Sequence, residues 1–123
     1  MERIVRARMD EARALESALA ARDERGLHQF RIACKRLRYA FERIDSDRSW
    51  IAGAAEAFAE LSDALGEAHD RDVLLAILPP TMGRTQRRLL SERAAYVDRA
   101  TELWKDVPDA IAPACSHRFH SAL

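Results

Sequence analysis

Glycine and proline are scarce in this 123-residue chain, which holds four of each. These two residues are the usual interruptions of a regular helix, so their scarcity favours long helical segments. Strand patterns are also missing, because no apolar–polar alternation is bounded by turn residues. Alanine, leucine, arginine and glutamate dominate instead, and all four are good helix formers. The sequence therefore predicts an all-α protein.

Long apolar runs and a cysteine framework are missing as well. No stretch approaches the roughly 18 uncharged apolar residues of a membrane-spanning helix, so no membrane span is predicted. The first fifteen residues are charged throughout and lack the apolar region of a secretory signal. Two cysteines, Cys34 and Cys115, are too few for a disulfide framework, and Cys34 falls on an apolar helix face. These absences predict a cytoplasmic protein.

Net charge is also missing, because 20 lysines and arginines balance 20 aspartates and glutamates. This balance argues against wholesale electrostatic attraction to nucleic acid, although a local basic patch remains compatible with it. Hydrophobic residues make up 48% of the chain and charged residues 33%, which is typical of a globular protein. The length suits one domain, residues 1–123, with one core.

Four amphipathic helices are predicted, at about residues 2–23, 27–44, 50–78 and 85–107. Because the loops between them are short, neighbouring helices should be antiparallel, as in an up-and-down four-helix bundle. Residues 108–123 are expected to form a tail, either loose or with a short helix.

Glycines and prolines set the expected ends of these helices. Gly26 is expected to separate the first helix from the second, and Gly66 to allow a bend in the third. Pro79 and Pro80 are expected to end the third helix, and Pro108 the fourth.

The second helix carries a row of basic side chains beside its core face. On a helical wheel of about 100° per residue, the apolar positions share one broad face. They are Leu27, Phe30, Ala33, Cys34, Leu37, Ala40, Phe41 and Ile44. A narrow stripe beside that face holds His28, Arg31, Lys35, Arg38 and Glu42, at spacings of 3, 4, 3 and 4. We call the first four of these residues the basic stripe; Arg36 and Arg43 lie on the far side of the wheel.

Like charges at such spacings destabilise an isolated helix by roughly 0.2–0.5 kcal/mol per pair, so the basic stripe predicts an anionic partner. Arginine suits phosphate because its planar fork donates paired hydrogen bonds. A row with the pitch of a helical turn fits a polyanion with repeated charges. The alternative is a solvated face, or one paired with acids of a neighbouring helix.

Acids gather in the third helix, between Leu61 and Leu78. Asp70 is expected either to hydrogen-bond an arginine of the basic stripe or to be a surface acid. Asp72, two residues later, should point elsewhere, so the two do not form a paired acid–base couple or a metal site. The apolar residues of this stretch are expected in the core: Leu61, Leu65, Val73, Leu74 and Ile77.

Two motifs carry a resemblance to a known family. They are HQFRIACKRLRYAFE, from His28, and LGEAHDRDVLL, from Leu65. Together they resemble the CHAD family, the conserved-histidine α-helical domain. The resemblance implies a helical domain that binds inorganic polyphosphate without a cofactor, and whose relatives accompany triphosphatase-type domains or localise to polyphosphate granules. It implies these phosphate contacts: His28, Arg31, Lys35, Arg36 and Arg38. It implies these supporting residues: Tyr39, Glu42, Asp70 and Asp72.

The chain departs from that family in its length. A CHAD domain usually contains two four-helix halves around a basic channel, and this chain has the length of one half. We therefore expect a homodimer, in which a two-fold axis brings two basic stripes together.

Other functions stay open at this point. A histidine phosphotransfer domain would use His28 as phospho-acceptor, but Ile32 is bulky where that pattern needs a small residue. A nucleic-acid binder would bind weakly, because few aromatics are free to stack. A helical interaction scaffold is a third alternative.

No motif of an enzyme is present, so no catalytic residue is predicted. His117 and His120 have metal-ligand spacing, but no acid or cysteine completes a site, and no metal is expected. His69 is expected to join a surface hydrogen bond. The larger aromatics are expected in the core: Phe30, Phe41, Trp50, Phe58 and Trp104.

Overall fold

The computed structural model describes residues 2–43 and 49–115, and within these ranges every regular element is a helix. The elements are α1 (Glu2–Ala14), α2 (Ala18–Ala21), α3 (Glu24–Glu42), α4 (Ser49–Ile77) and α5 (Gly83–Cys115). The predicted all-α class is confirmed.

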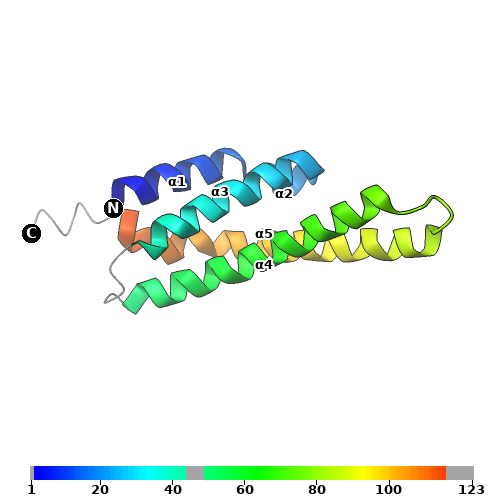
Figure 1. Cartoon of the computed structure of the whole chain (residues 1–123). Helices are drawn as coiled ribbons and strands as arrows, with labels where there is room; N and C mark the ends of the chain where they lie inside the picture. Colours follow the sequence, from blue (N-terminus) through cyan, green and yellow to red (C-terminus); the bar gives the residue numbers. More distant parts are fainter. Residues whose placement is uncertain (1, 44–48, 116–123) are drawn as a thin grey trace, which may run out of the picture.

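The four long helices form an up-and-down bundle (Figure 1). Helix α1 packs against α3, α3 against α4 and α4 against α5, and α5 returns to contact α1. Helices α4 and α5 are longer than α1 and α3, so the far end of their hairpin projects beyond the rest of the bundle (Figure 1). No helix in the described ranges is long and apolar enough to cross a membrane.

The first predicted helix is two helices, and Gly26 does not separate it from the second. The chain turns at Arg22, whose φ of 61° is left-handed, and α3 begins at Glu24. Asp23 caps α3, because its carboxylate accepts a hydrogen bond of 2.8 Å from the backbone N–H of Gly26. A Cβ at position 26 would lie 2.6 Å from that carboxylate, so glycine there makes room for the cap.

The expected end at Pro108 is also wrong, because α5 continues to Cys115. Proline removes one backbone hydrogen bond but does not prevent helix where packing compensates. Val107 and Ile111, on either side of Pro108, are both buried in the core. Their burial accounts for the continuous helix. Helix α4 is continuous through Gly66, where a bend is expected from the sequence.

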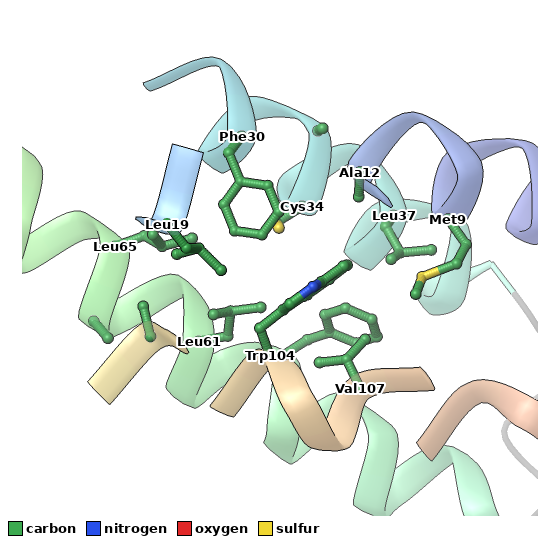
Figure 2. Close-up of a cluster of buried hydrophobic side chains, with 14 of the residues drawn as sticks. Met9, Ala12, Leu19, Phe30, Cys34, Leu37, Leu61, Leu65, Trp104 and Val107 are labelled. Carbon is green, nitrogen blue, oxygen red and sulfur yellow. The ribbon is translucent and has the colours of Figure 1, made fainter. Parts of the chain in front are cut away.

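The core matches the predicted apolar face of the second helix, since seven of its positions are buried: Leu27, Phe30, Ala33, Cys34, Leu37, Ala40 and Phe41. Figure 2 shows Phe30 and Trp104 in this cluster, with their ring centroids 5.1 Å apart in an edge contact. Phe58 packs on Phe41, and the indole N–H of Trp104 donates to Glu16. Of the residues predicted for the core, Ile44 and the Trp50 side chain lie outside the described part.

Three residues predicted for the core are exposed instead. Leu61 and Leu65 are buried, but Val73, Leu74 and Ile77 are 48%, 45% and 73% exposed. They lie in the part of α4 that projects past the start of α3, where no third helix covers them. We call these three residues the apolar face of α4.

Candidate functional site

An open groove of about 530 Å³ runs between α3 and α4. Three members of the basic stripe line one wall: Arg31, Lys35 and Arg38. The other wall comes from α4: Ser62, Asp63, Gly66, Glu67 and Asp70. The stripe borders this groove because the neighbouring face of α3 is buried against the core, which turns the next row of side chains toward α4. The structure thus brings three predicted phosphate contacts together in the α3–α4 groove.

Arg31 lies against α4 at Gly66. A Cβ at position 66 would stand 3.8 Å from Nη2 of Arg31, which is an ordinary van der Waals distance, so the guanidinium packs beside the helix at this position. The Nε of Arg31 is buried and has no hydrogen-bond acceptor among the described residues. Arg31 therefore has a donor that the described residues leave without an acceptor.

Arg38 is already partly neutralised. Its Nε donates to Oε1 of Glu42 over 3.1 Å, one helical turn away, and both side chains are at least 40% exposed. An exposed pair of this kind contributes little to stability and exchanges readily with solvent or another anion. Glu42, predicted to support the site, thus contacts one member of the basic stripe.

The α4 wall of the groove is acidic. Glu67 already has a cation, because Nη1 of Arg71 donates to its carboxylate. Asp63 and Asp70 have no ion pair within the described part of the chain. The hydrogen bond expected between Asp70 and an arginine of the basic stripe is not seen, although both line the groove. The groove is therefore of mixed charge, with its cations along α3.

Asp72 points away from this groove, as the spacing from Asp70 predicts. It is 8% exposed and forms an ion pair with Nε of Arg93 on α5. Arg93 also donates a 2.8 Å hydrogen bond to the backbone oxygen of Arg22, at the turn after α2. Asp72 thus links α4 to α5 and to the chain ahead of α3.

His28 continues the basic stripe past Arg31 and is exposed. Its ring stacks on that of His69 from α4, with centroids 5.0 Å apart and planes 22° from parallel. The expected surface hydrogen bond of His69 is not present among the described residues. The contact depends on how two antiparallel helices align, so neither motif alone indicates it.

Arg36 and Tyr39, also predicted for the site, lie elsewhere. Arg36 is exposed and lines a second cavity of about 410 Å³ between α1 and α3, as its position on the wheel predicts. Tyr39 is 55% exposed and lines neither the groove nor that cavity.

The remaining candidates are metal ligands and the cysteine nucleophile. Among the described residues, no three histidines, cysteines or acids gather as a metal site requires. His117 and His120 lie outside those residues. Burial raises the pKa of the Cys34 thiol to about 12, so this cysteine stays protonated and unreactive at neutral pH.

Comparison with known families gives one finding. A family model described as the CHAD domain matches residues 3–112, which is most of the chain. Comparisons with curated proteins and with solved structures gave no match.

Proposed function

Since the chain belongs to the CHAD family, a family of polyphosphate-binding domains, we propose that it binds inorganic polyphosphate along the α3–α4 groove. The observation that carries this proposal is the alignment of Arg31, Lys35 and Arg38 on one wall of that groove. Successive phosphates of a chain would meet successive turns of α3. The family is one of binding domains rather than catalysts, and we expect recruitment or sequestration without chemistry.

The contacts would differ along the row. Arg31 and Lys35 have no ion-pair partner among the described residues, so they would bind phosphate directly. Arg38 would exchange Glu42 for phosphate. Charge-assisted hydrogen bonds of this kind are about twice as strong as neutral ones. Arg36, on the other side of α3, would bind only a chain that wraps around the helix.

We further propose a homodimer. The apolar face of α4 continues the groove, because Val73, Leu74 and Ile77 follow Asp70 at helical spacing on the same side of α4. Exposed apolar patches of this kind mark interaction surfaces. A second copy seated there would place its own basic stripe close to the groove. In the cell we expect this assembly in the cytoplasm, at polyphosphate granules.

The test is a titration with long-chain polyphosphate, DNA and RNA at equal charge and in rising salt. The variant R31A/K35A/R38A should lose polyphosphate binding while its circular dichroism stays helical. A matched control, R84A/R87A/R88A, removes the same charge from exposed arginines of α5 that form no ion pair within the described residues.

The outcomes separate the candidate functions. Preference for polyphosphate, lost only in the α3 variant, supports the proposal. Equal loss in both variants means that net charge alone drives binding. No preference over nucleic acid would overturn the proposed function.

A further inference from the structure

The stacked histidines stand at one end of the α3–α4 groove. Arg31 lines both this groove and a small cavity of about 10 Å³ beneath the histidine pair, so the two spaces are adjacent. A phosphate chain that follows the basic stripe from Arg38 to Arg31 reaches His28 and, across the helix pair, His69. His69, which belongs to the motif LGEAHDRDVLL, would thereby contact the same phosphate chain as the basic stripe.

The charges around the pair are few. Besides the two rings, the charged or titratable residues that line the small cavity are Glu24 and Arg31 of α3 and Asp72 of α4. Asp72 is committed to Arg93 of α5. Two imidazolium rings 5.0 Å apart beside an arginine would repel one another, with the carboxylate of Glu24 as the remaining counter-charge.

A bound phosphate would make protonation of both rings favourable, because its negative oxygens attract each positive ring. Histidine titrates near neutral pH, so binding and protonation are coupled. Each ring would take one proton from solvent, at its unprotonated nitrogen, and no covalent bond to phosphate forms.

We propose that His28 and His69 together form a proton-dependent end of the polyphosphate site, so that binding takes up protons and strengthens as pH falls. This inference rests on the proposed function and adds His69 to the binding residues. The affinity for polyphosphate would then depend on pH. Arg31, Lys35 and Arg38 would set the affinity at high pH, and the protonated histidine pair would add to it at low pH.

Calorimetry with long-chain polyphosphate tests this at about pH 6 and about pH 8 and constant ionic strength, in buffers of different ionisation enthalpy. Long chains have few end groups, which themselves titrate near neutral pH. For the unaltered chain we expect an affinity about 10–100-fold higher at the lower pH, which by linkage corresponds to a mean uptake of about half to one proton over this interval.

Three variants give the comparison. His69→Gln should reduce both the pH ratio and the proton uptake, and His69→Arg should flatten the ratio by keeping a fixed charge. The double variant H117Q/H120Q, which removes the other two histidines of the sequence, should keep the ratio of the unaltered chain. Circular dichroism checks that each variant stays helical.

The results distinguish the two proposals. If polyphosphate binds but the pH ratio and proton uptake survive in both His69 variants, this inference is wrong and the proposed function stands. If polyphosphate binds at neither pH, both are wrong. Loss of the ratio in His69→Gln, with normal behaviour of H117Q/H120Q, supports the histidine pair.

Discussion

Asp63 and Asp70 face the three cations of α3 across the groove. Both are exposed, so salt and solvent weaken their effect on a bound anion. They still repel phosphate, so the acids of the α4 wall should weaken the binding of polyphosphate to the cations of α3.

We predict that D63N/D70N binds polyphosphate a few-fold more tightly, since each exposed charge contributes roughly 0.2–1 kcal/mol. Titration at low and moderate salt measures this, and the gain should shrink as salt rises. D106N/D109N, which alters two exposed acids of α5 that form no ion pair within the described residues, is the matched control. An equal gain in the control would place the polyphosphate outside the groove.

Cys34 gives a prediction on reactivity and pH. Because burial raises its thiol pKa from 9.0 to about 12, the folded chain should resist alkylation at about pH 8. Mass spectrometry of a Cys115→Ser variant, which leaves one thiol, should show labelling only in denaturant. The neutral thiol favours the folded state below about pH 9, and this contribution should disappear as pH rises toward 12. Fast labelling without denaturant would contradict the buried position.

Two helical glycines should respond to alanine in opposite directions. Alanine is favoured over glycine in a helix by about 1 kcal/mol. At Gly53 a Cβ meets nothing within 4 Å, so Gly53→Ala should raise the free energy of unfolding by about 0.5–1 kcal/mol. At Gly26 a Cβ would strike the cap carboxylate of Asp23, so Gly26→Ala should lower it by about 1 kcal/mol. Urea unfolding measures both, and a gain at position 26 would show that the cap is unimportant.

The ion pair of buried Asp72 and largely buried Arg93 holds α4 to α5. Removing one partner leaves the other charge largely buried without its counter-charge, so D72A should lower the free energy of unfolding by about 3 kcal/mol. Arg93→Met should be similarly costly, but D72A/R93M should lose clearly less than the sum of the two. Denaturant unfolding of the four proteins completes this cycle. Additive losses would mean that the pair contributes no coupling.

The assembly is tested through the apolar face of α4. Light scattering at tens of micromolar should show a dimer, and L74E/I77E should be a monomer. Ile4→Glu, at a 47% exposed position of α1 outside that face, should remain a dimer. A monomeric unaltered chain would exclude the homodimer, whereas a dimer that survives in L74E/I77E would move its interface elsewhere.

The sequence by itself determined the helical class, the buried face of α3 and the neighbouring row of Arg31, Lys35 and Arg38. These follow from helix geometry, because the period of about 3.6 residues fixes which side chains share a face. The same geometry sent Asp70 and Asp72 in different directions, and the two motifs together identified the family.

Only the tertiary structure decided which faces meet. The lengths of α4 and α5 relative to α3 leave Ile77 exposed, although its local pattern is that of a core residue. Burial of Val107 and Ile111 carries α5 past a proline, and the alignment of α3 with α4 puts His69 on His28. Such outcomes depend on contacts between helices distant in the chain, which the periodicity of each helix does not contain.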